Sequence, residues 1–198
     1  MTHLKVIRNC GESLAQLDSL VAATEKEVLG GAQGIKLITD NVNFFTKSFL
    51  ITLCAQLETC IKDVLYALAC DIDTRLQEAV IPEALLDWRY KAKKNEKQPI
   101  RAAFSVKMTK KEIDDVVSGN VYKTKDSLLI VGVDLAFDTA QWETWKDLIQ
   151  SIVTRRNNIV HHDDDASDLS FGDIRLYINS VKEYLNFISE ACRRAHNN

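Results

Sequence analysis

The sequence predicts an all-α fold, a bundle of four to five helices. Only 7 glycines and 2 prolines occur in 198 residues, and residue types that favour helices dominate the chain. Hydrophobic residues make up 46% of the chain and recur at helical spacing over long stretches, with no alternation of strands and helices. Length and composition predict a single domain that spans residues 1–198.

The first two predicted helices each carry an apolar stripe. Helical spacing predicts a helix over residues 11–29 that ends at Gly30, with Thr24 as a polar gap in a stripe that includes Leu20. Asp40 can cap a second, longer helix that continues to about residue 79. The stripe of this second helix is Phe45/Phe49, Leu53, Leu57, Cys60/Ile61, Val64/Leu65 and Leu68.

A basic and partly irregular insert is predicted between the second helix and the penultimate one, over residues 82–138. Pro99 interrupts it, and periodicity does not decide whether residues 127–135 form a strand or a buried helix. Residues 89–111 hold one acid and nine basic residues. We call these nine the basic patch: Arg89, Lys91, Lys93, Lys94, Lys97, Arg101, Lys107, Lys110 and Lys111. Such a patch can attract a polyanion, although charge runs are also common on solvated surfaces.

Two helices are predicted at the C-terminal end, on either side of the stretch RRNNIVHHDDD at residues 155–165. An Asp-Thr pair at 138–139 can cap a helix that continues to about residue 161. Ser170 and Asp173 form a capping-box pattern, which predicts that the final, amphipathic helix begins there.

Arg156 occupies a position where a core residue is expected, between Ile152 and Ile159 in the apolar register. A guanidinium there must extend to the surface or be paired, so we expect Arg156 to face inward or into an interface. At about 100° per residue, Asn157 and His161 can touch, whereas Arg156 and His161 lie about 140° apart. Packing of two copies about a two-fold axis would bring both Arg–His pairs to one cleft. This spacing therefore predicts a homodimer formed through this helix.

Residues 156–161 read R-N-x-x-x-H and resemble the signature of the HEPN superfamily, a group of helical ribonucleases and nucleotide-binding domains with the looser pattern R-x4-6-H. The second helix contains AQLETCIKDVL, with Glu58, which is similar to the A-x-L-E stretch of bacterial HEPN proteins of the RiboL-PSP type. The SGN turn at 118–120 also resembles that subgroup. The resemblance covers residues 40–190 and implies a HEPN-like bundle.

The resemblance implies a metal-independent endoribonuclease of a toxin or phage-defence type, without a cofactor, that acts at a dimer interface. Arg156, Asn157 and His161 are then the catalytic candidates. Histidine can exchange protons near neutral pH, and arginine offers a planar set of donors to phosphoryl oxygens. Asn157 can hold the imidazole or the phosphate. Attack by the 2′-OH of the RNA would leave a 2′,3′-cyclic phosphate and a 5′-OH.

The assignment within this motif is not unique. Arg155 with His161, or either arginine with His162, also fits the looser spacing. Arg155 and His162 are therefore supporting candidates, together with Glu58. That glutamate is either a polar residue at the edge of its helix or the partner of one of the two arginines.

Two other functions are considered for the same residues. A HEPN-like chain can serve as a non-catalytic dimeric interaction or nucleotide-binding module that keeps the motif for structure. The stretch HHDDD could serve a metal phosphodiesterase, but its carboxylates are consecutive in a loop and no second cluster accompanies them. We therefore predict no metal site.

The expected partners are RNA, held in part by the basic patch, and a second copy of the chain. A neutralising antitoxin or a defence-system protein is a further partner. HEPN toxins controlled by nucleotidyltransferase antitoxins often carry a tyrosine shortly after the histidine, and residues 163–165 are aspartates here. The N-terminus has no signal-peptide pattern, and we find no CxxC pair and no run resembling a membrane span. We expect a cytoplasmic protein without a membrane partner.

Overall fold

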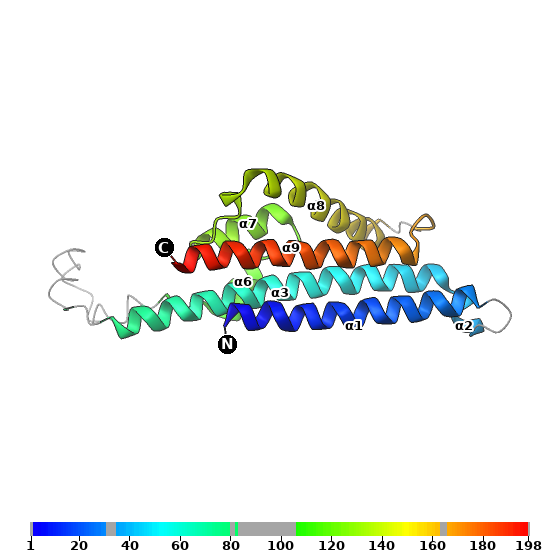
Figure 1. Cartoon of the computed structure of the whole chain (residues 1–198), viewed down its shortest axis with the longest axis horizontal. Helices are drawn as coiled ribbons and strands as arrows, with labels where there is room; N and C mark the ends of the chain where they lie inside the picture. Colours follow the sequence, from blue (N-terminus) through cyan, green and yellow to red (C-terminus); the bar gives the residue numbers. More distant parts are fainter. Residues whose placement is uncertain (1, 31–34, 80–81, 83–105, 163–165, 198) are drawn as a thin grey trace.

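The structure is a computed structural model that describes residues 2–30, 35–79, 82, 106–162 and 166–197 (Figure 1). Every regular element within these ranges is a helix, which confirms the predicted all-α fold. The elements are α1 (His3–Leu29), α2 (Lys36–Thr39), α3 (Val42–Glu78), α6 (Lys110–Val116), α7 (Val121–Ile130), the 3₁₀ turn η2 (Leu135–Phe137), α8 (Thr139–His161) and α9 (Phe171–Asn197).

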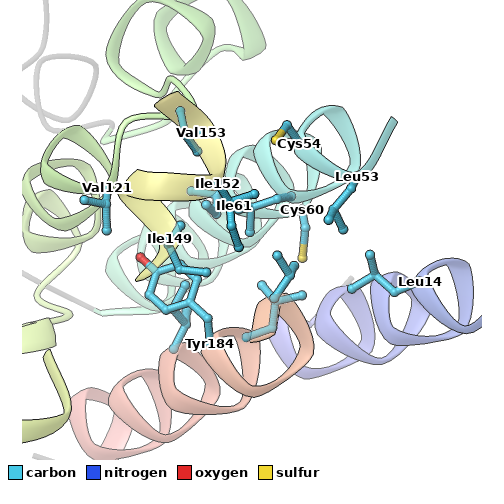
Figure 2. Close-up of a cluster of buried hydrophobic side chains, with 14 of the residues drawn as sticks. Leu14, Leu53, Cys54, Cys60, Ile61, Val121, Ile149, Ile152, Val153 and Tyr184 are labelled. Carbon is cyan, nitrogen blue, oxygen red and sulfur yellow. The ribbon is translucent and has the colours of Figure 1, made fainter. Parts of the chain in front are cut away.

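Three long helices, α1, α3 and α9, lie side by side and contact one another, and α8 packs on α3 and α9 with α7 beside it (Figure 1). Side chains from five helices meet in one core (Figure 2). Leu14 of α1, Ile61 of α3, Val121 of α7, Ile152 of α8 and Tyr184 of α9 are each at most 2% exposed. This shared core fixes the position of α8, which carries the R-N-x-x-x-H motif.

Helix α1 begins at His3, earlier than the predicted residue 11. Thr2 caps it by accepting a hydrogen bond from the backbone N–H of Lys5. Thr24, the predicted polar gap, is buried, and its hydroxyl donates to the Leu20 carbonyl at 2.9 Å. That bond satisfies the hydroxyl inside the helix, so a threonine can occupy the stripe. Leu20 was expected on the buried face, but it is 56% exposed.

Helix α3 runs over Val42–Glu78, close to the predicted range, but Asp40 does not cap it. Asp40 instead ends the short helix α2, because its backbone N–H bonds back to Lys36 and Ile38. The N-cap of α3 is Asn41, which makes no capping bond with its side chain.

By length and composition α3 could cross a membrane, since one window of 18 residues has a mean hydropathy of 1.2. The sequence reading had found no such run. Core helices of bundles have the same composition, and the apolar stripe of α3 packs in the shared core.

In the described part of the insert, every regular element is a helix, and irregular segments connect these helices. Of residues 127–135, the first four complete α7, so the strand alternative is wrong, whereas the helical one holds only for these four residues. The chain then turns at Gly132, whose φ of +80° suits glycine, and enters η2. Residues 83–105, with the first six residues of the basic patch, lie outside the described part of the chain.

The caps predicted for the last two helices are confirmed. The Asp138 carboxylate accepts from the Gln141 N–H at 3.0 Å and starts α8, which ends at His161. At the start of α9, the Ser170 hydroxyl accepts from the Asp173 N–H at 3.1 Å, and the Asp173 carboxylate accepts from the Ser170 N–H at 2.9 Å.

Candidate active site

Arg156 lies half-buried on α8, between the buried side chains of Ile152 and Ile159. Its Nη1 donates to Oδ1 of Asn157 at 3.0 Å, whereas its Nε is buried without a hydrogen-bond partner. Unpaired buried donors are rare because they lose their bonds to water. The guanidinium therefore lies in a partly apolar environment, and its Nε–H donor is not used.

Arg155 and His162 have structural partners. The Arg155 guanidinium forms an ion pair with Asp168, in the connection from α8 to α9. His162 is the C-cap of α8, and its backbone N–H donates to the Asn158 carbonyl at 2.9 Å. Both supporting candidates thus contribute to the end of the helix.

Within one chain, the structure does not bring His161 to Arg156. The side chain of His161 is exposed at the last residue of α8, and no hydrogen bond joins it to Arg156 in the described part of the chain. Five helical residues separate the two Cα atoms by about 7.5 Å along the axis and about 140° around it. One copy therefore supplies an inward arginine and an outward histidine.

Helix α3 faces the arginine with Cys54 and Glu58. Burial raises the pKa of the Cys54 thiol to about 12, while the positive charge of Arg156 opposes this rise and the negative charge of Glu58 adds to it. Both charges therefore lie close enough to Cys54 to act on it. Arg156 therefore lies near the part of α3 that carries Cys54.

Glu58 pairs with Lys62 at 2.8 Å, one turn along α3, and not with Arg155 or Arg156. Lys62 also contacts Asp114 of α6 at 3.0 Å, so this lysine links the two helices. The sequence reading missed Lys62, although the i, i+4 spacing from Glu58 was a usable signal.

The SGN turn closes the site between α3 and α8. A Cβ atom on Gly119 would lie 3.5 Å from Cγ1 of Val153 and 3.8 Å from Oε2 of Glu58. The Asn120 side chain accepts from the N–H groups of Tyr122 and Lys123 and so begins α7. The SGN turn therefore lies beside Glu58 of α3 and beside Val153, which precedes the R-N-x-x-x-H motif on α8.

From α6 to this turn, the chain runs antiparallel to α3. Lys110 Nζ lies 6.0 Å from the Tyr66 ring centroid, Asp114 meets Lys62, and Gly119 lies beside Glu58. Along α3, Tyr66 is about 12 Å from Glu58. The described end of the basic patch, whose members Lys107, Lys110 and Lys111 are all exposed, thus begins about two helical turns from the site.

The carboxylates of HHDDD, Asp163–Asp165, lie outside the described residues. In the described ranges, no three His, Cys, Asp or Glu side chains gather as they would around a metal ion.

A family model described as RiboL-PSP-HEPN matches residues 17–194. The chain belongs to the RiboL-PSP-HEPN family. The match begins inside α1 and ends inside α9, so it includes α3, the SGN turn and the whole of α8. The expected HEPN-like bundle is confirmed, and the family match extends further toward the N-terminus than residue 40. Comparison with curated proteins and with solved structures found no match. Membership of this family agrees with an RNA-related or dimeric module.

Proposed function

We propose that this RiboL-PSP-HEPN protein is a metal-independent endoribonuclease of a toxin or phage-defence type that works as a homodimer. Arg156 and His161 are the catalytic residues, and Asn157 supports them. The observation that carries this proposal is the half-buried Arg156, whose Nε has no partner and whose Nη1 is oriented by Asn157. A structural arginine in a core would be expected to use all its donors.

A dimer would supply both proton-transfer groups. His161 of one copy accepts the proton of the 2′-OH while the 2′-oxygen forms a bond to phosphorus. The bond between phosphorus and the 5′-oxygen breaks in the same step. His161 of the second copy gives a proton to that leaving oxygen. Arg156 donates hydrogen bonds to the equatorial oxygens, where negative charge increases. The exposure of His161 supports this division, because an exposed imidazole can approach a second copy.

The RNA strand would extend from the site along α6 toward Lys110 and Lys111. Both side chains are exposed and lie on the segment that follows α3 away from Glu58. Their contacts to phosphate would make binding weaker as salt rises.

The test is cleavage of a mixed tRNA and mRNA pool in excess EDTA by the wild type, Arg156→Ala, His161→Ala and His162→Ala, with each fold checked by circular dichroism. His162→Ala is the matched control, because it removes the adjacent exposed imidazole. We expect cleavage by the wild type and by His162→Ala, with 2′,3′-cyclic phosphate ends, and a loss of at least 100-fold in the other two variants.

Equal cleavage by wild type and His161→Ala would contradict the catalytic assignment. Cleavage lost in EDTA and restored by a divalent metal would instead favour a metal phosphodiesterase. If none of the proteins cleaves RNA, while the two motif variants alter only stability or assembly, the chain is better described as a dimeric interaction or nucleotide-binding module.

Titration of the wild type with an inactive variant tests whether the site is shared between copies. An excess of the double variant Arg156→Ala/His161→Ala places nearly every wild-type chain in a mixed dimer that holds one Arg156 and one His161. A site that uses His161 of both copies then lacks one proton-transfer group, so cleavage per wild-type chain should fall toward zero. A site made within one chain would keep the same cleavage per wild-type chain at every ratio.

A further inference from the structure

A second feature of the molecule lies between α1 and α3, where no residue of α8 takes part. A cavity of about 460 Å³ opens there, and both Cys10 of α1 and Cys60 of α3 line it. Cys10 is half-buried and Cys60 is 3% exposed. Figure 2 shows the Cys60 sulfur directed away from the α3 axis, into the space between the long helices. Two thiols from different helices thus share one opening to solvent.

The two thiols shift each other's pKa in opposite directions. A hydrogen bond from Cys60 lowers the pKa of Cys10 below its ordinary value, against smaller opposing effects of burial and of the nearby Asp63 carboxylate. The same hydrogen bond, together with burial and the charge of Asp63, raises the pKa of Cys60. Cys10 is therefore the thiol of the pair with the lowered pKa, and it is also the more exposed of the two.

The other three cysteines lack this combination. Burial raises the pKa of Cys54 and of Cys192 to about 12, which keeps both as protonated thiols. Cys70 lines a neighbouring cavity, where its interaction partner is the Tyr66 hydroxyl and not a thiol. Reactive cysteines are the accessible ones with thiolate character, and a second thiol nearby can complete a disulfide.

We propose that Cys10 and Cys60 are a hydroperoxide-reactive thiol pair, in which Cys10 is the site of attack and Cys60 closes a disulfide between α1 and α3. The Cys10 sulfur attacks one oxygen of the hydroperoxide and becomes a sulfenic acid as the O–O bond breaks. The other oxygen takes the proton of the Cys10 thiol and leaves as an alcohol, or as water when the oxidant is hydrogen peroxide. The Cys60 sulfur then bonds to the Cys10 sulfur. The hydroxyl of the sulfenic acid leaves with the Cys60 proton as water, so two thiols are oxidised and one peroxide is reduced.

The disulfide would close a loop that contains residues 11–59, which covers the rest of α1 and the first half of α3. A bond across such a loop restricts the unfolded chain and fixes α1 on α3. Since all the described residues that line the cavity belong to α1 and α3, this chemistry is independent of Arg156 and His161.

The test treats the whole chain with hydrogen peroxide, blocks the remaining thiols with N-ethylmaleimide and maps tryptic peptides without reduction. Cys10 lies on peptide 9–26, whereas peptide 48–62 carries both Cys54 and Cys60. We expect a linked pair of these two peptides in the wild type and in Cys54→Ala, the matched control, and none in Cys10→Ser or Cys60→Ala. Before oxidation, N-ethylmaleimide should label Cys10 roughly tenfold faster than Cys70.

A linked pair that persists in Cys60→Ala, a disulfide between two chains, or a Cys10 that stops at the sulfinic acid would overturn the proposal. If Cys60→Ala does not fold, fragmentation of the linked wild-type peptide decides. A bond assigned to Cys60 supports the pair, and a bond assigned to Cys54 refutes it.

Discussion

Replacement of Arg156 by methionine should separate stability from activity. Methionine keeps an unbranched stem of similar shape between Ile152 and Ile159 and removes the guanidinium. The buried Nε–H without a partner costs about 1–3 kcal/mol in lost hydration, and the bond from Nη1 to Asn157 contributes about 1 kcal/mol. The difference predicts that the free energy of unfolding of Arg156→Met rises by about 1 kcal/mol.

Cleavage of RNA should change in the opposite sense. Without the guanidinium, the negatively charged phosphoryl oxygens lose their hydrogen-bond donors. We therefore expect the cleavage rate to fall by about 100- to 1000-fold. A residue retained at a cost in stability and needed for activity is what a catalytic role predicts.

The assay is urea denaturation followed by circular dichroism, paired with RNA cleavage by the same samples. Arg155→Met is the matched control, because that neighbour forms an exposed ion pair with Asp168. It should lower the free energy of unfolding by less than about 1 kcal/mol and leave cleavage unchanged. A fall of about 2 kcal/mol or more in Arg156→Met, with cleavage intact, would show that the arginine serves the fold.

Three further outcomes follow from the same structure. Tyr184→Phe should keep or raise the free energy of unfolding, by up to about 1 kcal/mol as measured by urea denaturation. The Tyr184 hydroxyl is buried without a hydrogen-bond partner, and this burial raises its pKa. A large loss of stability would reveal a hidden partner. Hydrogen bonds from the Ser170 hydroxyl and N–H lower the pKa of Asp173. The Asp173 carboxylate therefore stabilises the fold fully at pH values above the ordinary pKa of an aspartate, and this stabilisation is lost as the pH falls through the lowered pKa. Asp173→Asn should therefore flatten the fall of stability with acid, and an unchanged acid titration would contradict this. Lys110→Ala with Lys111→Ala should weaken RNA binding and reduce its salt dependence, as measured by fluorescence anisotropy, whereas an unchanged salt slope would remove these lysines from the interface.

Local rules were enough to predict several elements of the fold from the sequence. The Asp138 cap and the reciprocal bonds of Ser170 and Asp173 depend on residues within one turn, so the starts of α8 and α9 were correct. Residue 127 onward could not be assigned from periodicity. Ser127 is buried, and its hydroxyl lies within hydrogen-bonding distance of the Lys123 carbonyl on α7 and of the Val116 carbonyl, eleven residues away. No local sequence pattern predicts the contact with Val116.

The candidate site was predictable in part. The register placed Arg156 inward, and the structure has it half-buried beside Ile152 and Ile159. Glu58 was expected either as a polar residue at the edge of its helix or as a partner of an arginine, and its ion pair with Lys62 was not predicted. Asp114 reaches Lys62 only because α6 packs on α3, and this tertiary contact holds the lysine next to the glutamate. Sequence spacing describes contacts within a helix, whereas the site depends on contacts between helices.

The proposed division of roles between Arg156 and His161 would explain why the motif needs both its spacing and its place in the bundle. Five residues on a helix separate the two side chains by about 140°, so one is turned to the core and the other to solvent. A spacing of four residues would put both on one face and would bury the histidine with the arginine. With a spacing of five residues, the bundle holds the arginine against α3, while the exposed histidine can contact a second copy of the chain. Activity should therefore depend on protein concentration in the range where the dimer dissociates, and a cleavage rate strictly proportional to chain concentration down to full dissociation would assign the whole site to one chain.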